Sequence, residues 1–147
     1  MRLIAAVLLS LVMLVPTREE ARPFSPKHSL RFDDIKYMLA YYESRNGESR
    51  VGVNPNGTRD YGIYQLNEEN FDPEKSGEEL AIAFDSIFAA HGVGRNLQLR
   101  IKVATHDDAL NEDLARALYE RRGIKQWYTY RMLRKHFDLS LLDQGAR

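Results

Sequence analysis

The sequence has no cysteine, which excludes disulfide bonds, thiolate metal sites and cysteine nucleophiles. It also has no excess of either charge, because Lys and Arg total 21 and Asp and Glu total 21. A chain without a net positive field is not expected to be a dedicated nucleic-acid binder. What the 147 residues do contain is 44% hydrophobic and 10% aromatic side chains, enough to bury one compact core.

The amino-terminal segment carries an uncharged apolar run at residues 3–15. A bilayer core needs about 20 such residues, so the run is too short to span one. We therefore predict a signal peptide over residues 1–22, without a sequence that fixes the cleavage site. A buried helix and an uncleaved membrane anchor are the alternatives. Two prolines indicate an extended linker over residues 23–28. We expect one domain over residues 29–147, exported to the periplasm or the cell exterior, with membrane contact only through the signal segment.

Apolar residues recur at helical spacing along most of this domain. The first helix is predicted to start after an N-cap at Ser29 and to end within residues 43–46, with Gly47 as its C-cap. The second is predicted to start at a capping box on Ser76 and to end near Gly92. These helices set a mainly α fold class.

Three further helices are predicted in the carboxy-terminal half. Apolar spacing from Leu97 to Ala104 indicates one helix, and Asn111 is a candidate N-cap for another that stops at Gly123. The last helix is predicted to start at Trp127.

Between the first two helices the pattern changes to short β-prone pieces around the Asn-Gly pair at 56–57. Such a pair is the strongest short-range signal for a β-hairpin. Residues 51–64 are therefore predicted to form one small hairpin beside the first helix. The expected fold class is mainly α, within the α+β class.

Two acids flank the junction between the first helix and the hairpin. Glycoside cleavage needs a protonated carboxylic acid and a second group that stabilises or traps the positive sugar centre. Glu43 follows three tyrosines on a helix that enters the core, so desolvation is expected to raise its pKa. Asp60 lies among polar hairpin residues and is expected to stay ionised. An acid at either place is more often a solvated charge, so spacing alone does not assign catalysis.

The residues around these acids are more specific than their spacing. Glu-Ser-Arg-Asn occupies positions 43–46 and Asp-Tyr-Gly-Ile-Tyr-Gln-Leu-Asn occupies 60–67. These strings resemble the active-site region of the lysozyme-like superfamily, which includes c-type lysozymes and small soluble lytic transglycosylases associated with bacterial secretion systems. A looser similarity extends to residues 113–118 and 123–127. The resemblance implies a lysozyme-like fold and cleavage of the β-1,4 bond between N-acetylmuramic acid and N-acetylglucosamine in peptidoglycan.

The resemblance also implies residue roles. Glu43 would be the general acid and Asp60 the second catalytic carboxylate. The remaining matched positions would bind substrate or shape the cleft, and they are Ser44, Tyr61, Gly62, Tyr64, Gln65 and Asn67. Ser44 would in addition support the glutamate. Because Tyr61 and Tyr64 are expected on opposite faces of a strand, one of them is expected to stack on a sugar ring.

Two reactions stay open. In a lytic transglycosylase the muramoyl 6-hydroxyl attacks internally and leaves a 1,6-anhydro end, whereas in a hydrolase water attacks. The absence of cysteine departs from c-type lysozymes and favours a transglycosylase, and the absence of a Tyr-Asn pair departs from transglycosylases. Our first hypothesis is a lytic transglycosylase, the second a hydrolytic lysozyme, and the alternative of another class is a non-catalytic glycan-binding or assembly module.

The remaining polar clusters predict less. His91, His106 and His136 lie too far apart to indicate a metal site, and no cofactor is expected. The acidic pair at 107–108 fits a helix start better than a charge relay. The basic stretch at 121–135 fits a solvated helix face better than a surface for anionic polymers. The expected partner is the peptidoglycan glycan strand, bound by a monomer.

Overall fold

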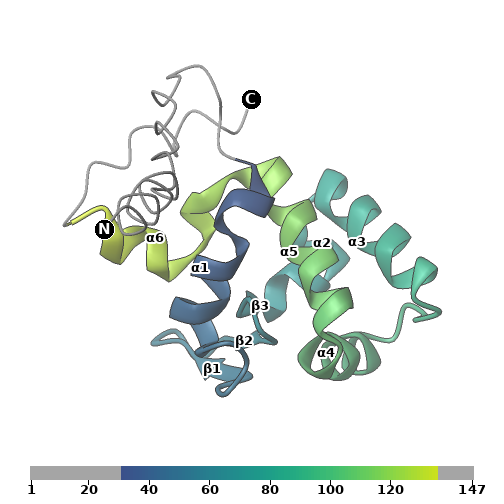
Figure 1. Cartoon of the computed structure of the whole chain (residues 1–147). Helices are drawn as coiled ribbons and strands as arrows, with labels where there is room; N and C mark the ends of the chain where they lie inside the picture. Colours follow the sequence, from purple (N-terminus) through teal and green to yellow (C-terminus); the bar gives the residue numbers. More distant parts are fainter. Residues whose placement is uncertain (1–30, 136–147) are drawn as a thin grey trace, which may run out of the picture.

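The computed structural model describes residues 31–135, which form a mainly helical domain with a small antiparallel sheet (Figure 1). The helices are α1 (Phe32–Ser44), α2 (Pro73–Ser76), α3 (Glu78–Ala90), α4 (Leu97–His106), α5 (Asp108–Arg122) and α6 (Tyr128–Leu133), with 3-10 turns η1 (Glu68–Phe71) and η2 (Ile124–Gln126). The strands are β1 (Val51–Val53), β2 (Arg59–Tyr61) and β3 (Leu66–Asn67). No helix in this range is long and apolar enough to cross a bilayer. The predicted signal peptide, linker and Ser29 cap lie outside the described residues.

Helix α1 ends where it was predicted to end, but with a different cap. Ile35 and Leu39 are buried one turn apart on its core face. The C-cap is Arg45, which adopts the left-handed conformation with φ of 53°. The prediction of Gly47 as the cap is wrong, because the chain has already turned by then: the Gly47 N–H donates to the Ser44 hydroxyl at 2.8 Å and closes a loop behind the helix.

The predicted hairpin is confirmed, and a third strand extends it. Strand β2 pairs antiparallel with β1, and the turn between them closes through the Asn54 N–H donating to the Thr58 carbonyl at 2.8 Å. Gly57 in this turn has a positive φ of 86°, which its missing side chain permits. Strand β3 pairs on the other side of β2, with Asn67 opposite Asp60. The sheet order is β1-β2-β3.

The prediction that Ser76 is the N-cap of the second long helix is wrong. Ser76 is the last residue of the short helix α2. The Asp72 side chain accepts the Glu74 N–H at 3.0 Å, and Pro73 occupies the first turn of α2, so a helix starts before the predicted one. Gly77 then separates α2 from α3.

The prediction that Asn111 is the N-cap of α5 is wrong, because the helix starts earlier in the sequence. Its cap is Asp107, whose carboxylate accepts the Leu110 N–H at 3.0 Å. This agrees with the helix-start interpretation of the acidic pair. Asn111 lies inside α5 and is fully buried. The end of α5 at Gly123 is confirmed, with φ of 69° there.

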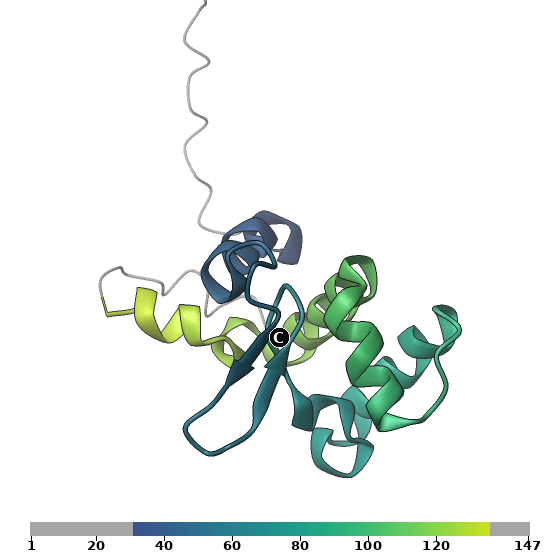
Figure 2. The ribbon, with the colours of Figure 1, turned by 90° about the horizontal axis from the view of Figure 1, so that it is seen from below.

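Helix α5 is the centre of the core, with contacts to α1, α3 and α4. A cluster of phenylalanine rings, Phe71, Phe84 and Phe88, packs beneath it with centroids 6.1–6.4 Å apart. Helix α1 lies between α5 and α6 (Figure 1). Seen from below, the hairpin and α6 extend on the same side of the molecule (Figure 2). The fold thus brings the end of α1, the hairpin and the start of α6 together.

Candidate active site

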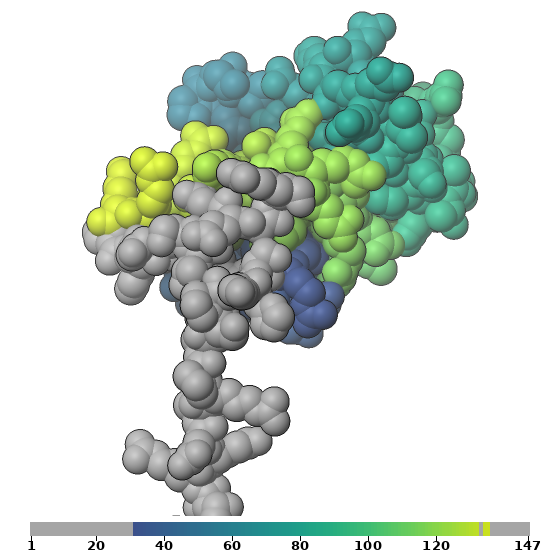
Figure 3. Space-filling view, turned by 90° about the horizontal axis from the view of Figure 1, so that it is seen from above, coloured from purple at the N-terminus to yellow at the C-terminus, as the bar shows by residue number. Residues whose placement is uncertain are grey.

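A groove with a volume of about 470 Å³ lies where these elements meet. One wall, the hairpin wall, consists of the lining residues of the turn 54–58, of strand β2 and of residues 65–67. The other, the α6 wall, consists of Trp127, Tyr128 and Arg131. Residues of η1 and α2 also line the groove. The space-filling view shows the hairpin and α6 on the same side of the molecule, with the end of α5 beside them (Figure 3). Both predicted catalytic acids, Glu43 and Asp60, line this groove.

Glu43 occupies the last turn of α1 and is half-buried. One of its carboxyl oxygens accepts the backbone N–H of Thr129, in the first turn of α6, at 2.8 Å. Burial raises the pKa of Glu43, and the hydrogen bonds from Thr129 oppose that shift. The charge of Asp60 raises the pKa of Glu43 further, and the charge of Arg131 lowers it. The raised pKa that the sequence predicted is confirmed in direction and in its main cause.

Asp60 lies on β2 and is held by side-chain amides. Asn67 donates its side-chain N–H to Asp60 Oδ1 at 2.8 Å. The polar surroundings predicted for Asp60 are therefore present, but burial raises its pKa as well, against hydrogen bonds from Asn67 and Asn54 that lower it. The acidic neighbour Glu68 raises it further. Each acid is thus desolvated, and each is fixed by a donor from a different wall.

Four of the predicted substrate-binding residues do not line the groove. Tyr61 and Tyr64 are only 8% and 3% exposed, so neither ring is available to stack on a sugar. The prediction fails because Gly62, also buried, has φ of 81° and ends the strand, so residues 61–64 do not alternate between two faces. Ser44 is buried and donates its hydroxyl to the Ile63 carbonyl at 2.6 Å. Its role is to fix the end of α1 against this segment.

Gln65 and Asn67 do line the groove, although their amide nitrogens are engaged inside the protein. Gln65 donates to the carbonyl of Gly62 at 2.8 Å and to that of Ser49 at 3.0 Å. Asn67 donates to Asp60, and its carbonyl oxygen accepts the Glu69 N–H at 3.1 Å. Both side chains shape the hairpin wall.

Sequence reasoning missed the residue that secures this wall from behind, Asn111. Its side chain accepts the Tyr64 N–H at 2.9 Å and donates to the Tyr61 carbonyl at 3.2 Å. A Cβ added to Gly62 would overlap the Asn111 side chain, so only glycine fits there. Trp127 adds a third support, donating its indole N–H to the Tyr64 carbonyl at 2.9 Å. The available signal was an asparagine on the apolar face of a helix, which needs a buried partner.

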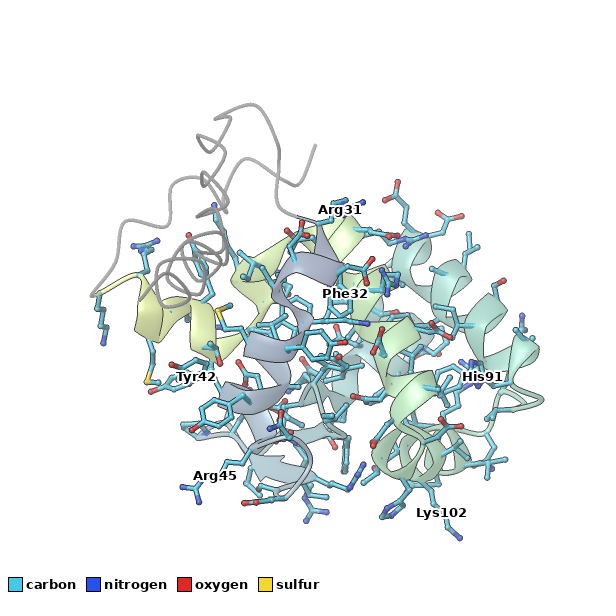
Figure 4. The ribbon with its side chains drawn as sticks, viewed as in Figure 1. Arg31, Phe32, Tyr42, Arg45, His91 and Lys102 are labelled. Atoms are coloured by element: carbon cyan, nitrogen blue, oxygen red, sulfur yellow. The ribbon has the colours of Figure 1, made fainter. Side chains whose placement is uncertain are left out.

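Tyr128 and Arg131 were also missed as groove residues, and Thr129 was missed as the backbone donor to Glu43. The basic stretch at 121–135 was interpreted as a solvated face, yet Arg122 and Arg131 line the groove. Figure 4 shows Tyr42, the neighbour of Glu43, beside α1 on the side nearer α6. Arg45 lies at the carboxy-terminal end of α1. The cationic and aromatic side chains of the groove close to the candidate acid are those of Arg131, Trp127 and Tyr128.

The two histidines of the described residues, His91 and His106, do not line this groove. His91 contacts the carboxylate of Asp113 at 3.1 Å, and His136 lies outside the described residues. Across residues 31–135, no three or more His, Asp or Glu side chains are grouped so that they could hold a metal ion. The expectation that the protein needs no metal or cofactor remains a prediction.

No protein-family model matches the chain, and no curated protein or solved structure matches it either. The chemistry of the groove therefore has to follow from its own residues. A desolvated carboxyl such as that of Glu43 is suited to donate a proton, and a second carboxylate nearby is suited to stabilise positive charge. The amide side chains on the hairpin wall are engaged within the protein and set the shape of the groove.

Proposed function

We propose that the protein is a glycosidase that cleaves the β-1,4 bond between N-acetylmuramic acid and N-acetylglucosamine in peptidoglycan. The observation that carries this proposal is the carboxyl of Glu43, which burial keeps more easily protonated than an ordinary glutamate and which lines a groove with Asp60. The groove volume of about 470 Å³ falls in the range of roughly 300–1,000 Å³ that is usual for ligand sites. The resemblance of residues 43–46 and 60–67 to the lysozyme-like superfamily supports the substrate.

The first candidate reaction is that of a lytic transglycosylase. Glu43 protonates the bridging oxygen, and the bond from that oxygen to C1 of the muramoyl unit breaks. The 6-hydroxyl oxygen of the same unit then bonds to C1, and its proton returns to the Glu43 carboxylate. The products are a 1,6-anhydro end and a free 4-hydroxyl, without consumption of water. Glu43 acts as acid and then as base.

The second candidate reaction is hydrolysis, and the position of Asp60 in the same groove favours it. Here the Asp60 carboxylate would stabilise or trap the positive centre at C1, and water would supply the oxygen of a reducing end. Mass spectrometry of the released fragments separates the two reactions, because an anhydro end is lighter than a reducing end by one water molecule.

The deciding experiment compares peptidoglycan solubilisation by the full chain and by its Glu43→Gln variant. Loss of the proton donor is expected to lower the rate by about a hundredfold or more. Glu48→Gln is the matched control, because Glu48 is exposed and does not line the groove. A fall of less than about tenfold, which is about 1.4 kcal/mol of transition-state stabilisation, would show that Glu43 is not the acid.

The same assay tests the non-catalytic alternative. Binding to glycan strands without release of soluble fragments, when a control enzyme releases them, would identify a glycan-binding module. The substrate also requires export, as residues 1–22 predict. Sequencing the amino terminus of the exported protein is expected to give a start after residue 15, which would exclude an uncleaved anchor.

A further inference from the structure

Helix α6 presents two side chains to the groove that are not used elsewhere in the described part of the protein. Tyr128 and Arg131 are one helical turn apart, so they share a face, and both line the groove. The two residues between them, Thr129 and Tyr130, are buried. Tyr128 is 65% exposed, which leaves its ring accessible to a ligand. The groove face of α6 is therefore an aromatic ring beside a guanidinium group.

Arg131 differs from the other cations of the groove. Arg122 donates to the Asn70 side chain and to the Ser76 carbonyl, and Lys75 lies 4.0 Å from a carboxylate oxygen of Glu69. The Arg131 side chain makes no hydrogen bond or ion pair with any residue from 31 to 135. A guanidinium group has five N–H donors in a fixed plane, which match a carboxylate. Its charge also acts on Glu43, so it lies near the candidate acid.

We propose that Tyr128 and Arg131 form a subsite for an acidic saccharide unit, whose ring stacks on Tyr128 while its carboxylate pairs with Arg131. This inference rests on the proposed function and adds to it the residues that distinguish the muramoyl unit from a neutral sugar. The carboxylate has two sources: the lactyl group in peptide-free glycan, and the stem peptide in peptide-bearing glycan. Oligomers of N-acetylglucosamine have neither.

The experiment measures equilibrium binding by calorimetry with the full chain carrying Glu43→Gln, so that no turnover occurs. The three ligands are peptide-free glycan, a peptide-bearing muropeptide and an N-acetylglucosamine oligomer. Adding Arg131→Gln is expected to weaken binding of a carboxylated ligand by about tenfold and to leave the neutral oligomer unchanged. Adding Tyr128→Ala is expected to weaken all three by a similar factor, because stacking does not depend on charge.

Arg134→Gln is the matched control, since Arg134 is an exposed arginine at the end of the same helix that does not line the groove. Weakening by Arg131→Gln on only one carboxylated ligand supports the proposal and identifies the source of the carboxylate. Equal weakening on the neutral oligomer, or an equal effect of Arg134→Gln, would overturn it. If the Glu43→Gln protein binds none of the three ligands, the proposed function fails as well; binding that ignores Arg131 refutes the subsite alone.

Discussion

The two walls of the groove differ in how their polar groups are used. On the hairpin wall, side chains pair with one another: Asn67 with Asp60, and Asn54 with Thr58 at 3.2 Å. On the α6 wall, Tyr128 and Arg131 have no such partner among residues 31–135. A wall whose hydrogen bonds are internally satisfied sets shape, whereas a wall with free donors offers binding energy to a ligand. Each acid is held from one wall: Asp60 lies on the hairpin and accepts from Asn67, whereas Glu43, at the end of α1, accepts from Thr129 of α6.

Among changes to the hairpin wall and its supports, substitution of Gly62 is expected to cause the largest loss of stability. Gly62→Ala puts a side chain at φ of 81° and against both Asn111 and the Ala104 carbonyl, so it is expected to lower the free energy of unfolding by about 3 kcal/mol. Gly57→Ala is the control, because Gly57 has φ of 86° but open space around it, and about 1 kcal/mol of strain is expected there. Urea denaturation of both variants measures the difference. Equal losses would mean that packing against Asn111 is unimportant.

A smaller loss is expected when the support behind that wall is removed. Asn111→Leu keeps the number and branching of the side-chain heavy atoms but leaves the Tyr64 N–H and the Tyr61 carbonyl buried without partners. About 2 kcal/mol of unfolding free energy is expected to be lost, again measured in urea. A loss below about 0.5 kcal/mol would show that the segment finds other partners.

The two walls are expected to act on Glu43 with opposite sign. Arg131 lowers the pKa of Glu43 and Asp60 raises it, so Arg131→Gln should shift that pKa upward and Asp60→Asn should shift it downward. Titration of the glutamate carboxyl carbons by NMR, with the signal assigned by its loss in Glu43→Gln, measures both shifts. Shifts of the same sign would contradict the electrostatic division between the walls.

The smallest expected effect is on the pH dependence of the free energy of unfolding. The raised pKa of Glu43 means that the native state holds a proton more tightly than the unfolded chain, for which the ordinary value is 4.5. The contribution of Glu43 to stability therefore falls as the pH rises from that value through the raised pKa. Glu43→Gln should become more stable relative to the unmodified protein over the same interval, as thermal unfolding at each pH will show. Glu48→Gln should show no such trend; a matching trend would assign the effect to surface charge.

The sequence was sufficient for features that depend on local pattern. The end of α1 near Glu43 follows from apolar spacing, and the hairpin follows from Asn-Gly at its turn. Glu43 and Asp60 could be paired as candidates because the helix and the hairpin are adjacent in the chain. The groove they share confirms that adjacency in space.

Features that depend on distant partners could not be predicted. Strand β3 is two residues long and exists because Asn67 pairs with Asp60 across the sheet. Asn111 binds Tyr64 and Tyr61, which precede it by 47 and 50 positions in the sequence, and no local rule locates such a partner. Tyr64 was assigned by strand alternation, which stops at the left-handed backbone of Gly62.

Residues 61–65 are tied to α1, to α5 and to the N-cap of α6 by four hydrogen bonds, one with Ser44, two with Asn111 and one with Trp127. Widening the groove would mean breaking bonds of this kind, at roughly 1 kcal/mol each. The groove is therefore expected to keep its width without a ligand, and binding does not require the protein to close. The loss of conformational freedom on association then falls on the ligand rather than on the protein.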